Sequence, residues 1–388
     1  MKRGVVVGAL RTAQTLAWGS SYYLPAILAD PIADGLGLSR TVVFGVFSGS
    51  LLVSALLGPP VGRAIDAHGG RGVLALSNLV LAAGLVLLAL TQGVVSLVAA
   101  WTVLGVGMAM GLYDPAFATL AGLYGRAARG PITGITLIAG FASTVGWPLS
   151  ALLEAHFGWR GACFVWAALN LLIGLPLNRL LIPRAPPPVR ATEAETAGPA
   201  PRGAMLLLSF VFAATWFVTG AMAAHLPRLL EIAGASATAA IAAAALVGPA
   251  QVGARLVEFG ALKRVHPVIS ARLAAALHPI GAVVLMAIGP SAIMAFAVLH
   301  GAGNGLLTIA KGTLPLAIFG PVGYGLRNGI LAAPARAAQA ASPLIFGLLI
   351  DWLGVGALAI SAGMSIAALL ALMALRARTS STAMPPQA

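Results

Sequence analysis

Apolar residues run along the chain in long, nearly unbroken stretches that are separated by short polar turns. A helix that crosses a bilayer needs about 20 apolar residues, whereas the strands of a membrane barrel show short alternating segments. The stretches here are continuous and long enough to span a bilayer, so they predict an all-α membrane protein. We expect twelve transmembrane helices, at residues 4–29, 41–61, 72–91, 94–122, 132–154, 160–183, 204–230, 236–257, 271–289, 291–319, 329–350 and 354–376.

One polar segment, residues 184–203, interrupts this pattern near the middle of the chain. It reads RAPPPVRATEAETAGPAPRG, and its proline, small polar residues and mixed charges are typical of a flexible connector. The segment divides the chain into an N-terminal part, residues 1–183, and a C-terminal part, residues 204–388, which ends in a short tail. We expect each part to form a six-helix bundle.

The two parts share residues at a nearly constant offset. The first part has Gly107, Gly111, Ala116, Thr119 and Leu120, and the second has Gly301, Gly305, Ala310, Thr313 and Leu314, each 194 positions later (301 − 107 = 194). Such an offset over several helices indicates an internal repeat. Two parallel six-helix repeats predict a transporter architecture with a solute site between them.

Composition agrees with a lipid environment. The chain is 59% hydrophobic and only 9% charged, whereas about 25% of the residues in a soluble domain are charged. The net charge of +13 would suggest nucleic acid in a soluble protein, but here the charges lie between the apolar runs. We therefore expect a lipid bilayer as the partner and no nucleic acid. The single Cys163 excludes a disulfide and a cysteine-based metal site, and we expect neither a metal nor a cofactor.

The lysines and arginines predict which side of the membrane each turn faces. Most of them fall in turns on one side, with Arg255 assigned there as well, and the other side has only Arg40, Arg160 and Arg228. Positive residues gather on the cytoplasmic side, so both termini and the connector are expected there. We expect a monomer in a bacterial inner membrane.

The turn between the second and third predicted helices has a recognisable pattern. Residues 62–71 read GRAIDAHGGR, in which Gly62, Asp66, Gly69 and Arg71 match the loop signature of the major facilitator superfamily, while Ala67 and Gly70 replace usual basic residues. The chain therefore resembles that superfamily. The resemblance implies its fold, two pseudo-symmetric six-helix bundles, and a cytoplasmic charge cluster that latches the halves. An ordinary polar turn is the alternative.

A second resemblance is weaker. Residues 140–148, GFASTVGWP, are similar to the glycine-proline motif of antiporters in the family, although the second glycine pair after Pro148 is missing. Residues 158–161, GWRG, are similar to a turn found between the fifth and sixth helices of many members. The resemblance favours a secondary transporter, with antiport and efflux as one form of it.

Polar faces occur on four of the predicted helices. His300, Asn304, Thr308, Lys311 and Pro315 follow a helical spacing, as do Arg11, Gln14, Trp18, Tyr22 and Pro25. Such faces line protein or water and not lipid. The other two helices contribute Asp114 and Trp216. The resemblance implies that these helices, the first, fourth, seventh and tenth, line the central cavity. The candidate solute-binding residues are Gln14, Trp18, Tyr22, Trp216, His300, Asn304, Lys311 and Arg336.

Charged residues inside a span are functional candidates because burying them in lipid is costly. A desolvated Asp114 could take up and release a proton near neutral pH, and His300 is the second proton-coupling candidate because histidine titrates near pH 6.5. Simpler alternatives stay open. Arg11 could reach toward the headgroups, Lys311 could only neutralise Asp114, and Asp114 could satisfy backbone groups beside Pro115.

These residues favour a secondary transporter that moves a small solute with protons by alternating access, in the direction of efflux. An uptake permease for a small organic anion such as a monocarboxylate is the alternative, and a non-transporting membrane sensor or assembly factor is the alternative from another class. An enzyme is not expected, because the sequence offers no nucleotide-binding loop and no histidine-rich metal cluster.

Overall fold

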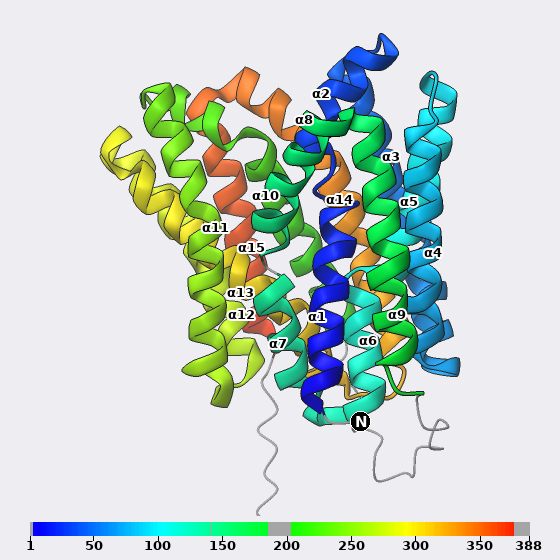
Figure 1. The fold of residues 1–388 in the computed structure, drawn as a ribbon. Coiled ribbons are helices and arrows are strands. Elements are labelled where there is room, and N and C mark those ends of the chain that lie inside the picture. Colours follow the sequence, from blue (N-terminus) through cyan, green and yellow to red (C-terminus); the bar gives the residue numbers. More distant parts are fainter. Residues whose placement is uncertain (1–2, 140, 185–202, 376–388) are drawn as a thin grey trace, which may run out of the picture.

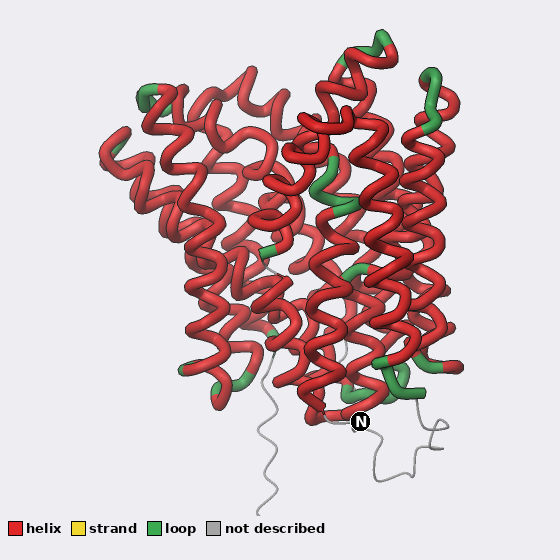
Figure 2. The backbone as a smooth tube through the Cα atoms, in the orientation of Figure 1, coloured by secondary structure: helices red, strands yellow, loops and turns green. Residues whose placement is uncertain are grey.

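The computed structural model describes residues 3–139, 141–184 and 203–375, and all of the regular elements in these ranges are helices (Figure 1; Figure 2). The prediction of an all-helical chain is confirmed. Apart from its two end residues, the predicted connector at 184–203 lies outside the described residues, as does the tail beyond residue 375.

The first part of the chain forms nine α-helices and two short helices of other types. They are α1 (Arg3–Gly19), α2 (Pro25–Leu36), α3 (Arg40–His68), α4 (Gly70–Ala89), α5 (Val94–Gly111), α6 (Tyr113–Tyr124), η1 (Gly125–Ala128), α7 (Arg129–Ala139), α8 (Ala142–Leu169), η2 (Asn170–Gly174) and α9 (Leu175–Leu180). The second part forms α10 (Ala204–Ile232), α11 (Ala237–Gly260), η3 (Leu262–Arg264), α12 (Pro267–Ile288), η4 (Pro290–Ala292), α13 (Ile293–Phe319), α14 (Tyr324–Leu353), η5 (Gly354–Gly356) and α15 (Ala357–Ala374).

Nine helical stretches of the described residues are long and apolar enough to cross a membrane. The predicted count of twelve is therefore not reproduced directly. Three of the stretches, Val94–Leu137, Val145–Leu180 and Tyr324–Ala374, contain 44, 36 and 51 residues. They are longer than the roughly 20 residues that one crossing needs, so each holds more than one crossing's worth of helix. Residues of the first predicted span, 4–29, are divided between α1 and α2.

Two breaks explain how the helices differ from the predicted spans. Gly158 has φ of 66° and interrupts α8 between the predicted fifth and sixth spans. Only glycine adopts this left-handed region readily, so the chain bends there. The other break separates α1 from α2, and Pro25 begins α2 at a position where its missing N–H is not needed.

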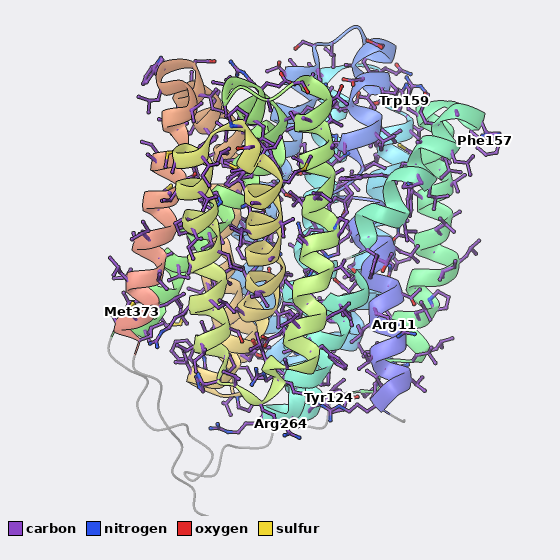
Figure 3. All side chains as sticks on the ribbon, turned by 90° about the vertical axis from the view of Figure 1, so that its left-hand side faces the viewer. Arg11, Tyr124, Phe157, Trp159, Arg264 and Met373 are labelled. Atoms are coloured by element: carbon purple, nitrogen blue, oxygen red, sulfur yellow. The ribbon has the colours of Figure 1, made fainter. Side chains whose placement is uncertain are left out.

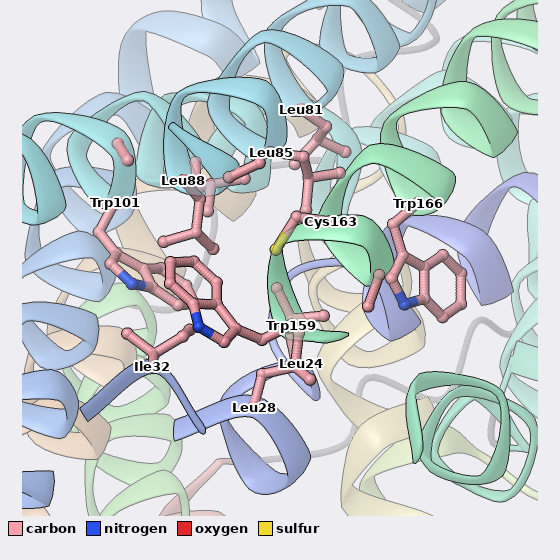
Figure 4. Packing of buried hydrophobic residues seen from close by; sticks show 14 of the residues in the cluster. Leu24, Leu28, Ile32, Leu81, Leu85, Leu88, Trp101, Trp159, Cys163 and Trp166 are labelled. Atoms are coloured by element: carbon pink, nitrogen blue, oxygen red, sulfur yellow. The ribbon is translucent and has the colours of Figure 1, made fainter. Parts of the chain in front are cut away.

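The hydrophobic core is divided between the two parts of the chain. The largest buried cluster draws all of its fully buried members except Ala340 from residues 17–167, and it is built around Trp101, Trp159 and Trp166 (Figure 4). Two other buried clusters lie entirely within residues 204–375. In Figure 1, α11, α12, α13 and α15 lie on the left and α3, α4, α5 and α9 on the right, while α14 of the second half lies beside α3.

The two parts meet where α3 packs against α14. A Cβ atom added to Gly62 would lie 2.0 Å from the carbonyl oxygen of Gly325, and one added to Gly329 would lie 2.5 Å from the carbonyl oxygen of Gly58. Such distances are too short for any side chain. Small residues allow this close backbone approach between helices in a membrane.

We expect Gly62→Ala to lower the melting temperature of the purified protein in detergent. The added methyl group overpacks the contact between α3 and α14, which typically costs about 1–3 kcal/mol. Gly72→Ala is the matched control, because a Cβ atom at that exposed helical position meets nothing within 4 Å. Equal melting temperatures for the two variants would contradict the close packing.

Candidate functional site

Asp114 lies in the first turn of α6, just after a break in the helix. Leu112, with φ of −83° and ψ of −163°, separates α5 from α6, and Asp114 precedes Pro115. Among the described residues, the hydrogen bonds that its carboxylate accepts come from the side chains of Lys311, Asn328 and Arg336 and not from the backbone. The alternative in which Asp114 satisfies backbone groups at the kink is therefore not what the structure shows. Its carboxylate, which is 7% exposed, has other partners.

Two cations from the second half of the chain hold this carboxylate. The Nζ atom of Lys311 on α13 lies 3.0 Å from Oδ1, and the Nη2 atom of Arg336 on α14 lies 2.6 Å from Oδ2. Asn328 on α14 also donates to Oδ1, at 3.2 Å. Lys311 is 6% and Arg336 is 7% exposed. The sequence singled out Asp114, Lys311 and Arg336, and the fold brings them into one buried contact.

Arg336 also reaches a second helix of the first half. Its Nη1 atom donates to the carbonyl oxygen of Ser54 on α3 at 3.0 Å and also to the Ser54 hydroxyl. Lys311 lies over the ring of Trp216 on α10, 4.9 Å from the ring centre. Two positive charges against one negative charge leave this cluster with a net charge of +1. The cluster is therefore both a link between the halves and a positively charged site.

The polar face predicted on the first span has mixed roles. Gln14 donates to the carbonyl oxygen of Gly111 at 2.6 Å, which ties α1 to the end of α5. Trp18 packs against Tyr22 and Tyr113, with ring centres 5.1 and 4.9 Å away. Tyr22 accepts a hydrogen bond from Gln339 on α14 at 2.7 Å, so it too links the halves.

The predicted stripe on the tenth span divides between two surroundings. Lys311 faces Asp114 in the other half of the chain. Asn304 instead accepts a hydrogen bond from Thr219 on α10 at 3.2 Å, and His300 contacts His278 on α12, with 3.0 Å between their Nδ1 atoms. His300 and Asn304 thus lie inside the second half, beside a cavity of about 20 Å³ that the two residues help to line.

The hydrogen bonds around the two histidines determine which nitrogen carries each proton. Ser361 donates to the carbonyl oxygen of Leu358, so the Nε2–H of His278 must donate to the Ser361 hydroxyl, at 3.0 Å. A neutral His278 then accepts at Nδ1 from the Nδ1–H of His300. The Nε2 atom of His300 is left as an acceptor. His278 was missed by the sequence reasoning, since a single histidine in an apolar run carries no signal of its partner.

The motif at residues 62–71 forms a contact between the halves. Both oxygens of Asp66 accept backbone N–H groups at the start of α14, from Gly325 and Leu326, each at 2.8 Å. A carboxylate is favourable there because a helix N-terminus carries partial positive charge. Gly69, with φ of 79°, forms the turn, and the buried Nε atom of Arg71 has no hydrogen-bond partner among the described residues.

A second contact of this kind joins the halves at the same end of the molecule. Arg129 on α7 lies 3.2 Å from Glu258 on α11, and its Nη2 atom donates to the carbonyl oxygen of Leu262 at 3.1 Å. Glu258, 2% exposed, also accepts from Ser270 at 2.7 Å. The sequence reasoning missed this pair. A signal existed, because Glu258 follows Asp66 by 192 positions (258 − 66 = 192), close to the repeat offset.

His266 lies outside the spans, beside this second contact. Burial, together with the nearby charges of Arg129 and Arg272, lowers the pKa of His266 below its usual value. Its Nδ1 atom accepts the N–H of Val268 at 3.2 Å and so caps the start of α12. A neutral ring suits this role, because the capping nitrogen must be an acceptor.

Two of the arginines named from the sequence, Arg11 and Arg255, differ in their exposure. Arg11 is exposed on α1 (Figure 3), in agreement with the alternative that it reaches toward headgroups. Arg255, which the charge pattern groups with the cytoplasmic side, lies within α11 and is 4% exposed. Its guanidinium points between helices and donates to the carbonyl oxygen of Thr136 in the other half. Figure 3 shows Tyr124 and Arg264 at the same end of the molecule.

Solved structures share this architecture. The human organic anion transporter MFSD10 (TETRAN) has a TM-score of 0.71 at 16% identity, covering 96% of this chain and 100% of that one. The proton:xylose symporter XylE, solved with 6-bromo-6-deoxy-D-glucose, has a TM-score of 0.74 at 14% identity, covering 96% of each chain. The transporter FucP, in the outward conformation, has a TM-score of 0.72 at 12% identity, covering 94% and 97%. At these identities the likeness is one of fold.

The fold, two helical halves joined by buried charges, is shared with these solved membrane transporters. The model of the Major Facilitator Superfamily matches residues 12–288, which is more than half of the chain. The chain therefore belongs to the major facilitator superfamily, whose members are transporters and not enzymes. It is also 30% identical over 342 residues to an uncharacterized 38 kDa protein in the 23S RNA operon of Thermoproteus tenax, covering 81% of this chain and 88% of that protein.

Proposed function

We propose that the protein is a secondary transporter that moves a small solute together with protons by alternating access. It would do so through twelve spans in two bundles, residues 1–183 and 204–388, joined by the connector at 184–203. The observation that carries the proposal is the buried Asp114 carboxylate, which is held by Lys311 and Arg336 from the opposite half. A group that changes charge with one proton is thus placed in a contact that must break when the halves move.

Protonation of Asp114 would weaken the link between the halves. A neutral carboxyl group loses its ion pairs with Lys311 and Arg336, whose burial then becomes more costly. The equilibrium between two conformations shifts toward the one in which the cations find other partners. Asp114 is therefore the proposed proton-coupling residue. His300 is a second candidate, because its Nε2 atom is an acceptor beside a cavity.

The charge of the cluster favours proton-linked uptake of an anion over efflux. With Asp114 ionised the net charge of the three residues is +1, and protonation raises it to +2. An anionic solute is therefore bound better after the proton than before it. Proton and solute would then move in the same direction, as in a symporter. Proton-coupled efflux requires that binding of the proton and binding of the solute exclude one another. A positive charge gained on protonation repels a cationic solute but not an anionic one, so efflux suits a cationic or neutral solute better.

The contacts made by Asp66 and Glu258 support a gate at one end of the molecule. Both join the halves at the end where the chain begins (Figure 1). The distribution of lysine and arginine supports the cytoplasm on this side. We propose that the membrane is a bacterial inner membrane. The structure then corresponds to a state that is closed toward the cytoplasm.

We expect Asp66→Asn to open this gate in part of the population. Asparagine has one acceptor oxygen in place of two, so it can accept only one of the two backbone N–H groups that Asp66 accepts. The negative charge at the start of α14 is also lost. Together these changes shift the free-energy difference between the closed and open states by about 1 kcal/mol. Spin labels on Arg126→Cys and Lys263→Cys, both exposed and on opposite halves, measure the separation in a Cys163→Ala background. A longer-distance population should grow about fivefold. Asp30→Asn, which affects an exposed pair within the first half, is the control.

The test of the proposed function is transport by the full chain in liposomes. Purified protein is first screened at two pH values against carboxylates, sugars and amines, since a bound solute raises the melting temperature. The stabilising solute is then followed into liposomes with an acidic exterior. Gradient-driven uptake that a protonophore abolishes is the expected result. Uptake that ignores the pH gradient would refute proton coupling, and uptake equal to that of protein-free liposomes would refute transport.

A further inference from the structure

His266 ends the turn between α11 and α12, at the end of the molecule where Asp66 and Glu258 join the halves. It is partly exposed, and its Nδ1 atom accepts the N–H of Val268 at 3.2 Å, so the ring is the N-cap of α12. Protonation would turn this acceptor into a donor. It would also place a positive charge at a helix N-terminus, where positive charge is unfavourable. The closed structure therefore favours a neutral His266.

The turn that His266 ends is also a part of the second half that Arg129 holds. Arg129, on α7, donates to the carbonyl oxygen of Leu262 at 3.1 Å and pairs with Glu258 at 3.2 Å. Glu258 also accepts from Ser270, which lies in the first turn of the helix that His266 caps, at 2.7 Å. The histidine cap and the ion pair between the halves are thus joined through one short segment of the chain.

The charged residues on the elements that meet at this turn come from both halves. Among the described residues they are Arg129 on α7, Glu258 on α11, Lys263 and Arg264 on η3, and Arg272 on α12. Arg272 donates to backbone carbonyl groups at the end of α15, within its own half, so it stays beside His266 when the halves move. Of this set only Arg129 belongs to the first half and leaves.

Separation of the halves changes the charges that a proton on His266 meets. Arg129 and its positive charge move away, and the buried carboxylate of Glu258 loses its cation. Both changes favour a positive charge nearby, because a like charge is removed and an opposite charge is left unpaired. The pKa of His266, which burial and the charges of Arg129 and Arg272 lower in the closed state, therefore rises in the open state. Proton binding then shifts the balance toward the open state by the same factor.

We propose that His266 is a regulatory proton site, which opens the gate formed by the Asp66 and Glu258 contacts when the cytoplasm becomes acidic. This inference rests on the gate in the proposed function and adds a regulation to it. The site is separate from Asp114, the proposed residue for the transported proton. In a carrier that brings in protons with its solute, an inner gate that stays open delays the return of the empty carrier. Uptake thus slows when the cytoplasm is already acidic.

A helix cap without a regulatory role is the competing explanation. Protonation of His266 would then only fray the start of α12, which lowers the melting temperature but leaves the distance between the halves unchanged. Two variants separate the explanations. His266→Asn keeps a residue that caps helices well but does not titrate. His266→Lys cannot accept a hydrogen bond and carries the charge of the protonated histidine throughout.

The experiment measures the distance between spin labels on Arg126→Cys and Met373→Cys, which are exposed positions on opposite halves, in the full chain with Cys163→Ala. Measurements at about pH 8 and about pH 5 lie on either side of the usual pKa of histidine. On acidification the ratio of open to closed molecules should rise about 10-fold more in the labelled parent protein than in His266→Asn, since one pKa unit is a factor of ten. His266→Lys should be open at both pH values. His156→Asn, at an exposed histidine of α8, is the control and should respond as the parent does.

Three results would overturn the inference. They are an equal response to pH in the parent and in His266→Asn, a closed gate in His266→Lys at the higher pH, and a lower melting temperature of His266→Lys with no change in distance. If His266→Lys does not fold, the comparison of the parent with His266→Asn decides. The labels need no solute, so opening in acid by a protein without gradient-driven uptake refutes the transport function and keeps the proton site. Gradient-driven uptake with a gate that ignores pH refutes the proton site alone.

Discussion

Liposomes that contain Asp114→Asn are expected to show no solute uptake above protein-free liposomes when a pH gradient is imposed. Asparagine has the shape of the carboxylate but cannot take up a proton, so the proposed coupling step is absent. Exchange of labelled for unlabelled solute at equal pH on both sides needs no net proton movement, and it should continue. Uptake by Asp114→Asn at the wild-type rate would remove this residue from the mechanism.

A control is needed because Asp114→Asn leaves two buried cations without an acid. Removing one partner of a buried ion pair typically costs about 3–5 kcal/mol. The double variant Asp114→Asn/Lys311→Gln restores the original net charge of +1, since Arg336 alone remains charged. It is expected to melt closer to wild type than the single variant and still to lack gradient-driven uptake. Uptake restored in the double variant would assign the defect to misfolding.

Arg336→Met is expected to lower the free energy of unfolding by about 3 kcal/mol, at the lower end of the usual range for a broken buried pair because Lys311 remains beside Asp114. The variant also lacks the hydrogen bonds that Arg336 donates to Ser54, so one direct connection between the two halves is lost. The measurement is the melting temperature in detergent. Arg228→Met is the matched control, because its pair with Asp351 has the same length of 2.6 Å but lies half exposed.

The contrast between these two arginines tests the effect of burial on one kind of contact. Exposed ion pairs contribute about 0–1 kcal/mol, because water competes for both partners. Arg228→Met should therefore change the melting temperature much less than Arg336→Met. A double-mutant cycle with Asp114→Asn isolates the pairwise energy between Arg336 and Asp114. An additive cycle would show that the two residues are not coupled.

Local features of the sequence account for the predictions that are confirmed. Continuous apolar runs require helices in lipid, because each backbone group must find its partner within the segment. The match to the superfamily's loop signature at residues 62–71 identified the right family, and Gly62 and Asp66 lie where α3 meets α14. Charges within apolar runs stand out because they are costly in lipid, and this brought forward Asp114, Lys311 and Arg336.

Partners that come from distant segments account for what the sequence missed. The two nitrogens of the His278–His300 contact lie on different helices, and neither helix shows a pattern that names the other. The charge pattern groups Arg255 with the cytoplasmic charges near the end of the predicted span 236–257, and it does not show where the side chain points. Only the packing of α11 against α7 shows that its side chain points inward. The count of twelve spans stays a prediction, because three of the described helical stretches are longer than one crossing needs.

By itself, the sequence determined that this chain is a helical membrane protein of the major facilitator superfamily, and it marked most of the buried charges as unusual. Both results follow from local properties, namely the length of apolar runs and the cost of a charge in lipid. Only the tertiary structure decided which charges meet. Asp114 is balanced by residues about two hundred positions away, while Arg255 has no acid within reach among the described residues, because helix packing and not sequence spacing sets the distances between side chains.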